Sequence, residues 1–182
     1  TRKKKFILFS FLLYLLNKLY CMEFSKASGT YRLYNKQFLP ISLETAWDFF
    51  SSPNNLQVIT PKELDFKITS IDSEKAYAGQ MITYSIKLNS IFKMNWVTEI
   101  THLENKNLFV DEQRFGPYKM WHHVHKFEKV DQGVLMTDII HFKLPFPLFA
   151  GISYNLIVKK KLRQIFSHRE LKLTELFSNE SE

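Results

Sequence analysis

The feature that most constrains this chain is a two-residue hydrophobic period that runs from about Leu64 to Lys143. Alternation of this kind is typical of strands with one face buried. Short turn sequences interrupt the run every ten to fifteen residues, which favours an antiparallel meander with short links. The sequence predicts six strands here, at 64–72, 80–88, 92–103, 107–115, 118–129 and 134–143.

The segments on either side of this run complete the expected fold. Residues 30–39 alternate as a seventh strand, and two short helices follow, one after the N-cap residue Ser42 and one from Pro53. Residues 148–177 lack proline and carry an amphipathic pattern, which predicts one helix of about 30 residues and about 45 Å. A twisted seven-stranded antiparallel sheet needs a cover, and only this helix is long enough. The sequence therefore predicts an α+β helix-grip fold that encloses an apolar cavity.

Residues 1–21 form a separate basic and hydrophobic leader, and residues 22–182 form the domain, with a core at 30–177. The leader has a lysine run followed by an 11-residue apolar stretch at 6–16, which is shorter than the roughly 20 residues of a spanning helix. We expect Met22 to be the true start and the protein to be cytoplasmic. The alternative is a membrane anchor at residues 6–16, so we expect membrane contact only through the leader.

Charge and cysteine content narrow the classes of partner. Five of the 25 basic residues and none of the 18 acidic ones lie in the leader, which leaves a net charge of about +2 on the body. A nearly neutral body argues against a nucleic-acid partner. The only cysteine, Cys21, excludes an intrachain disulfide and favours a reducing compartment.

The strand at 118–129 carries two histidines with the same orientation, His123 and His125. A three-residue loop at Gly116-Pro117-Tyr118 would place Asp111 opposite His123. A tight turn at Asp131-Gln132 would place Asp138 opposite His125. Two independent hairpins thus bring a carboxylate to each histidine, which is how buried charge is usually tolerated. The first register also places Gln113 opposite Trp121.

Several stretches resemble the START/SRPBCC superfamily, closest to its coenzyme Q-binding START-like and polyketide cyclase-like branch. They are Phe109-Val110-Asp111-Glu112-Gln113, the run from Gly116-Pro117-Tyr118 through Trp121-His122-His123-Val124-His125-Lys126-Phe127, Asp138, and Leu144-Pro145-Phe146-Pro147. The resemblance covers about residues 30–177. It implies a helix-grip fold with a cavity for a hydrophobic ligand, and it supplies no catalytic set.

We expect the cavity to bind a small hydrophobic or lipid-like ligand, as a carrier or sensor, with no cofactor and no metal. The alternative is a cyclase or isomerase that uses a buried His-Asp pair as general acid and base. A third possibility is an accessory module that docks through the C-terminal helix, and the oligomeric state is left open. Trp47, Trp96 and Phe50 are interpreted first as core. The candidate ligand-binding residues are Asp111, Gln113, Trp121, His123, His125, Asp138, Trp96 and Thr98.

The sequence allows three interpretations of the His-Asp cluster. It can be a satisfied polar network that fixes strand register, a site that recognises the head group of a ligand, or a centre for acid-base or divalent-metal chemistry. The sequence contains no HExxH or CxxC spacing and no Ser or Cys nucleophile in the domain that would favour the third.

Overall fold

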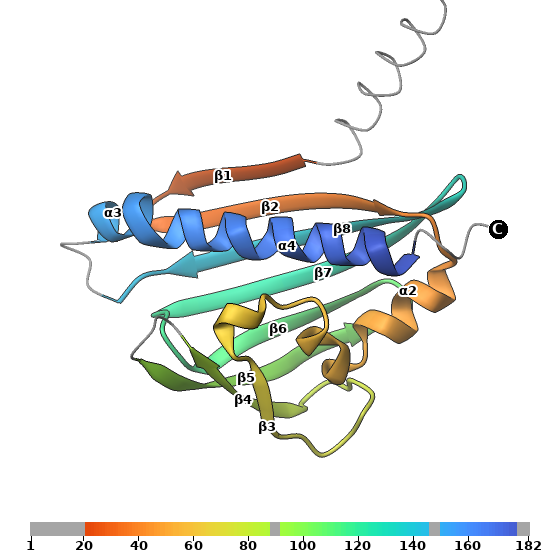
Figure 1. Ribbon diagram of the computed structural model, residues 1–182, viewed down its shortest axis with the longest axis horizontal. Coiled ribbons are helices and arrows are strands. Elements are labelled where there is room, and N and C mark those ends of the chain that lie inside the picture. Colours follow the sequence, from red (N-terminus) through yellow and green to blue (C-terminus); the bar gives the residue numbers. More distant parts are fainter. Residues whose placement is uncertain (1–20, 88–91, 146–149, 178–182) are drawn as a thin grey trace, which may run out of the picture.

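The computed structural model describes residues 21–87, 92–145 and 150–177. Eight strands come in chain order with short helices between β2 and β3 and a long helical segment at the end (Figure 1). The strands are β1 Cys21–Ala27, β2 Thr30–Leu39, β3 Lys67–Ser70, β4 Met81–Lys87, β5 Lys93–Glu104, β6 Leu108–Phe115, β7 Met120–Val130 and β8 Gly133–Lys143. The helices are α2 Leu43–Phe50, the 3-10 helices η1 Pro53–Gln57 and η2 Lys62–Leu64, α3 Ala150–Ser153, the π-helix η3 Tyr154–Val158 and α4 Lys159–Phe177.

All the strands form one antiparallel sheet in the order β1-β2-β8-β7-β6-β5-β4-β3. The predicted meander is confirmed, but the sheet has eight strands where the sequence predicted seven. The additional strand is β1, which pairs along β2 from Cys21↔Lys36 to Ala27↔Thr30. The segment from Ser25 to Gly29 forms the end of β1 and a tight turn in which Ser28 and Gly29 both have positive φ.

The C-terminal helix also differs from its prediction as one uninterrupted element. A π-helical turn, η3, separates the short α3 from α4. Within this turn Tyr154 is buried and its ring stacks on Tyr31 of β2, with centroids 4.0 Å apart. Two other residues of this turn, Leu156 and Ile157, are exposed. A π-helical turn contains more residues than an α-helical turn, so it rotates the residues that follow it about the helix axis. As a result α4 presents its own buried stripe to the sheet.

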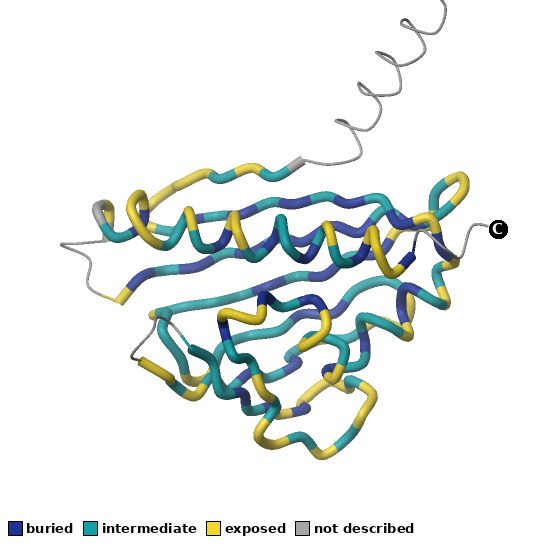
Figure 2. Tube along the Cα trace, viewed as in Figure 1, coloured by how far each residue is buried: buried dark blue, intermediate teal, exposed yellow. Residues whose placement is uncertain are grey.

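The core lies between the concave face of the sheet and α4 (Figure 1). Buried residues alternate along the strands and gather on one side of the helix, whereas its outer side is exposed (Figure 2). The stripe on α4 consists of Leu162, Phe166, Arg169, Leu173 and Phe177, at intervals of three and four residues.

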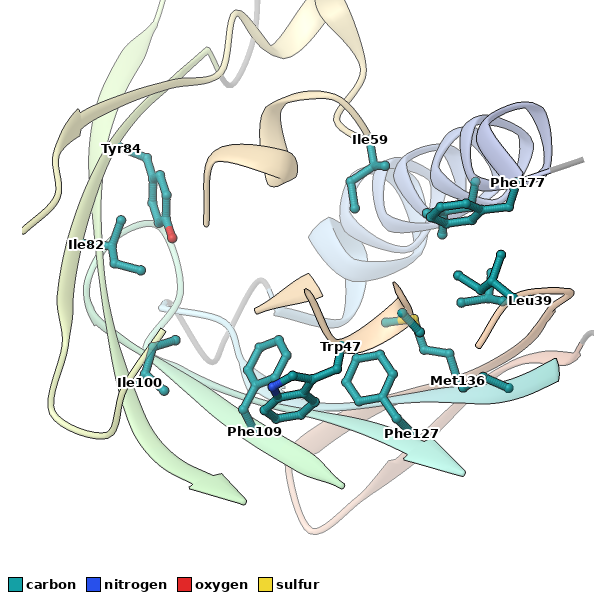
Figure 3. Packing of buried hydrophobic residues seen from close by; sticks show 14 residues of the cluster. Leu39, Trp47, Ile59, Ile82, Tyr84, Ile100, Phe109, Phe127, Met136 and Phe177 are labelled. Atoms are coloured by element: carbon teal, nitrogen blue, oxygen red, sulfur yellow. The ribbon is translucent and has the colours of Figure 1, made fainter. Parts of the chain in front are cut away.

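The helix α2 closes one end of this layer. It begins after Ser42, whose side chain accepts a hydrogen bond from the Thr45 amide, as its N-cap role predicts. Trp47 packs edge-on against Phe109 and Phe127 from the sheet, and Phe49 meets Phe177 at the end of α4. Figure 3 shows Trp47, Phe109, Phe127 and Phe177 converging from strands and helices on a common interior. Trp47 is therefore core, as predicted.

Residues 1–20 lie outside the described residues, and so does the proposed anchor at residues 6–16. In the part of the chain that is described, no helix combines the length and the hydrophobicity needed to cross a bilayer.

Candidate ligand-binding site

A pocket of about 260 Å³ lies between the inner face of the sheet, the helices η1 and η2, and α4. Apolar side chains from all of these elements make up most of its wall. The residues that define its sides include Leu56, Leu64, Ile82, Trp96, Phe109 and Phe166. In Figure 3, Ile82, Tyr84 and Ile100 form one side of this interior, Phe109 follows Ile100 along the sheet, and Ile59 lies across from them.

The polar part of the pocket comes from three adjacent strands. His123 and His125 are two residues apart on β7, so both side chains point to the buried face. The register places Asp111 of β6 opposite His123 and Asp138 of β8 opposite His125. Both hairpin registers predicted from the sequence are confirmed. Asp111, His123 and His125 line the pocket, whereas Asp138 lies behind them and is only 2% exposed.

The side-chain hydrogen bonds run diagonally rather than straight across. His123 Nε2–H donates to Asp138 Oδ1 at 2.9 Å, and His125 Nε2–H donates to Asp111 Oδ2 at 2.8 Å. The directly opposite pairs also approach each other, with 3.4 Å between His123 Nδ1 and Asp111 Oδ2, and 3.2 Å between His125 Nδ1 and Asp138 Oδ1. These two contacts are poorly aligned, so they are weaker than the first two. Each imidazole therefore bridges both carboxylates, so the predicted simple pairs are one four-membered network.

Aromatic rings hold the two imidazoles in position. The His125 ring stacks on Phe109 with centroids 4.2 Å apart, and the two histidine rings are 3.7 Å apart. Trp121 and Phe166 approach His123 edge-on. Because these rings restrict both side chains, the network is pre-organised before any ligand arrives.

Arg169 is the residue of this site that the sequence analysis missed. It reaches the network from α4, with Nη1 3.5 Å from Asp138 Oδ1, and it also lines the pocket. Its guanidinium lies over the rings of Phe50 and Phe166. The available signal was positional, because residue 169 falls on the apolar stripe between Phe166 and Leu173.

The network shifts the pKa of each titratable member. Burial favours neutral Asp138, but the Arg169 charge and the hydrogen bonds from both histidines outweigh it and hold the pKa well below its usual range. In the same way burial of Asp111 is outweighed by His123 and His125, so its pKa is lowered. Burial lowers the pKa of His123, helped by the charge of His125. For His125, hydrogen bonds to Asp111 and Asp138 overcome burial and raise the pKa.

These directions define which members of the network hold a proton most readily. Both carboxylates are favoured in the ionised form, Arg169 stays charged, and of the two histidines it is His125 whose protonated form is favoured. Pairing of opposite charges in this way is how buried ions are tolerated.

Three further candidates, Trp96, Trp121 and Thr98, also line the pocket. Trp96 and Trp121 pack edge-on, with centroids 5.4 Å apart. Trp96 and Phe50, first interpreted as core, thus have one side against the core and another on the pocket. Thr98 is hydrogen-bonded to the hydroxyl of Tyr84. Burial and the nearby Asp111 charge raise the pKa of this hydroxyl.

Gln113 is placed differently from the other candidates and does not line the pocket. Its side chain spans the β6–β7 turn, where Oε1 accepts from the Tyr118 amide and Nε2 donates to the Tyr118 carbonyl at 2.7 Å. A Cβ at Gly116 would lie 2.4 Å from Oε1, so a larger residue at this turn would displace the Gln113 side chain. Gln113 fixes the turn that sets the register of His123 and His125, and any contact with a ligand would be indirect.

Asp111, His123 and His125 also present one potential metal-ligand atom each within 4.8 Å of one another. Two histidines and a carboxylate suit several divalent metals. However, these atoms already share protons with each other, and Arg169 adds a fixed positive charge beside Asp138. A cation would have to displace those protons and bind against that charge, so the geometry favours a hydrogen-bonded network over a metal centre.

No known family profile matches the sequence, and no curated protein resembles it closely enough in sequence to count as a relative. Solved structures do resemble it. Protein Ms6760 from Mycobacterium smegmatis has a TM-score of 0.61 at 16% identity, over 86% of this chain and 98% of that one. A protein from Arthrobacter aurescens has a TM-score of 0.63 at 12% identity, over 84% and 91% of the respective chains.

The structure of Ara h 8.0201 is also similar. Its TM-score is 0.52 at 17% identity, and the match covers 81% of this chain and 99% of that one. At these identities the similarity concerns the fold alone, and it confirms the helix-grip architecture predicted from the sequence.

Proposed function

We propose that this protein binds a compact, mainly apolar molecule in the pocket between the sheet and α4, as a carrier or sensor. The observation that carries the proposal is the combination of an apolar wall with one buried polar network at a single place in it. Ligand sites typically combine apolar surface for affinity with a few fixed polar groups for orientation. We infer that His123, His125, Asp111 and Arg169 orient the polar end of the ligand.

The size of the pocket favours a compact occupant. Its volume of about 260 Å³ is just below the range of about 300–1,000 Å³ that is typical of small-molecule sites. A two-chain lipid needs far more space than this. A ring system or a single short chain fits better, and the aromatic residues Trp96, Trp121 and Phe109 offer flat surfaces for a ring.

An acid-base enzyme of the cyclase or isomerase type is the second candidate, because His123 lines the pocket and its pKa is lowered. A general base needs a ring nitrogen directed at the substrate. Each histidine here donates through Nε2 to one carboxylate and holds Nδ1 within 3.4 Å of the other. Both Nε2 atoms are taken up by hydrogen bonds to carboxylates, and each Nδ1 atom lies beside the other carboxylate of the network, which favours binding over catalysis.

We further propose a place in the START-like branch of the helix-grip proteins and a reducing, cytoplasmic compartment. The motif around His123 and His125 supports the first, and the single cysteine supports the second. The nearly neutral body favours a small-molecule ligand over a nucleic-acid partner.

Native mass spectrometry of the protein purified from its own host tests the function. We expect a fraction of the protein to carry an additional mass of a few hundred daltons that is lost on denaturation and extracts into organic solvent. Protein that is free of any such mass, and that binds none of the host's extracted apolar metabolites, would contradict the proposal.

A further inference from the structure

Arg169 is a buried charge whose hydrogen-bonding capacity is largely unused. Its side chain is only 7% exposed, on the face of α4 that packs against the sheet. A guanidinium carries five N–H donors in a planar fork and stays charged at any physiological pH. Burying such a group is costly unless its donors find acceptors.

The protein itself supplies little of what this group needs. The ion pair with Asp138 spans 3.5 Å, and Nε is buried with no hydrogen-bond partner. Among the described residues the guanidinium makes no hydrogen bond at all, and its other contacts are the faces of Phe50 and Phe166. Arg169 nevertheless is one of the residues that line the pocket. The unused N–H donors of Arg169 are therefore available to an acceptor that enters from the pocket.

The carboxylates are in the opposite situation. Asp111 accepts the His125 hydrogen bond at 2.8 Å and has His123 Nδ1 at 3.4 Å. Asp138 is behind the histidines and accepts from His123. Each carboxylate therefore accepts at least one hydrogen bond from a histidine, and Asp138 also accepts one from Asn35 at 3.4 Å, whereas the cation on α4 makes no hydrogen bond among the described residues. This asymmetry favours an incoming acceptor over an incoming donor.

We infer that the ligand is an apolar acid, whose carboxylate or acidic enol oxygen accepts hydrogen bonds from Arg169 while its apolar body lies against the pocket wall. The inference rests on the proposed ligand-binding function and specifies the chemical class of the ligand. Planar oxyanions match the geometry of the guanidinium fork and form strong, charge-assisted hydrogen bonds.

Three probes of one shape and different charge test this inference by calorimetric titration near pH 7.5. They are 2-naphthoic acid, the neutral 2-naphthamide and the cationic 2-naphthylmethylamine. We expect the wild-type protein to bind the acid about tenfold to a hundredfold more tightly than the amide, as suits one charge-assisted contact in a buried site. The amine should bind most weakly.

Variants on α4 connect this preference to one residue. Arg169→Met should bring the affinity for the acid down to that for the amide and leave the amide within about twofold. Arg163→Met is the matched control, since Arg163 is exposed on the same helix outside the pocket. It should change neither affinity. Arg169→Lys, which retains charge without the fork, should keep part of the preference and serves if the Met variant does not fold.

The outcomes separate the two proposals. Equal affinity for acid and amide, tightest binding of the amine, or an acid preference that survives in a folded Arg169→Met protein would overturn the inference. In each of these cases binding of the neutral amide would leave the pocket proposal intact. Failure of all three probes to bind would contradict both.

Discussion

At the residue scale, the site depends on two histidines whose surroundings differ although they are neighbours on one strand. Both are almost fully buried and both contact Asp111 and Asp138. Hydrogen bonds raise the pKa of His125, whereas burial and the charge of His125 lower that of His123. Separate titration of two adjacent imidazoles is thus a property of the network.

Titration of the imidazole signals by NMR tests this difference. We expect His125 to titrate above the ordinary histidine value of 6.5 and His123 below it. His125→Gln and His123→Gln variants assign the two signals by their disappearance. A higher pKa for His123 than for His125 would contradict the prediction, because it would make His123 the more readily protonated of the two.

A second prediction concerns the buried carboxylate beneath the histidines. Asp138→Asn leaves Arg169 without its carboxylate partner, and we expect a loss of about 3–5 kcal/mol of unfolding free energy in urea at pH 7. Glu112→Gln is the control, because Glu112 pairs with Arg114 and His122 at the surface. It should cost less than about 1 kcal/mol. Similar losses for the two variants would argue against a buried ionic network.

The same carboxylate sets the acid side of the stability curve. The pKa of Asp138 is lower in the folded state than its ordinary value of 3.8. The stability that it contributes is therefore present above that value and is lost as the pH falls through the folded pKa. His125 has the opposite sign, since its raised pKa contributes stability below 6.5 that is lost as the pH rises through its folded value.

At the scale of elements, the strands and registers of the central meander could be predicted and the helix geometry could not. Period-two alternation and tight turns define pairing to the residue, as in His123↔Ile140 and His125↔Asp138. β1 was missed because its seven residues alternate only over Met22-Glu23-Phe24 before the polar Ser25-Lys26, and it is pairing with β2 that stabilises it as an edge strand. The π-turn at Tyr154 depends on tertiary packing against Tyr31, which local sequence does not specify.

Side-chain geometry within the site was only partly predictable. The register specified which residues face one another, but the diagonal hydrogen bonds depend on ring orientations that Phe109 and Phe166 impose from other elements. Arg169 joins the network from α4, and no pattern in the sequence indicates which strand residues a helix will contact.

The β7–β8 turn offers a test of register at this scale. A Cβ added to Gly133 would lie 2.2 Å from the Leu39 carbonyl oxygen and 2.8 Å from the Phe38 ring. We expect Gly133→Ala to lower the free energy of unfolding by about 1–3 kcal/mol. Gly151→Ala, in an open position on α3 with nothing within 4 Å, should be neutral or stabilising by up to about 1 kcal/mol. Equal effects of the two substitutions would contradict the close approach of β2 and β8.

At the scale of the whole molecule, the sheet and α4 enclose one interior. Core side chains fill it near α2, and the pocket lies beside the polar network. A larger side chain that fills the pocket should weaken ligand binding without unfolding the protein. Ile165→Trp places a large ring in the pocket wall, whereas Ile139→Trp changes an equally half-buried residue that does not line the pocket. We expect the first to lower affinity for 2-naphthamide more than tenfold and the second to leave it unchanged, by calorimetric titration. Equal affinities for both variants would place the binding site elsewhere.

The most direct test of the pocket as a ligand site is a crystal structure of the protein soaked with 2-naphthoic acid. The proposed function predicts density for the naphthalene ring between Trp96, Phe109 and α4. The inferred preference for acids adds that the carboxylate lies beside Arg169. A pocket that contains only water at saturating probe, or density for the probe on the outer surface alone, would contradict it.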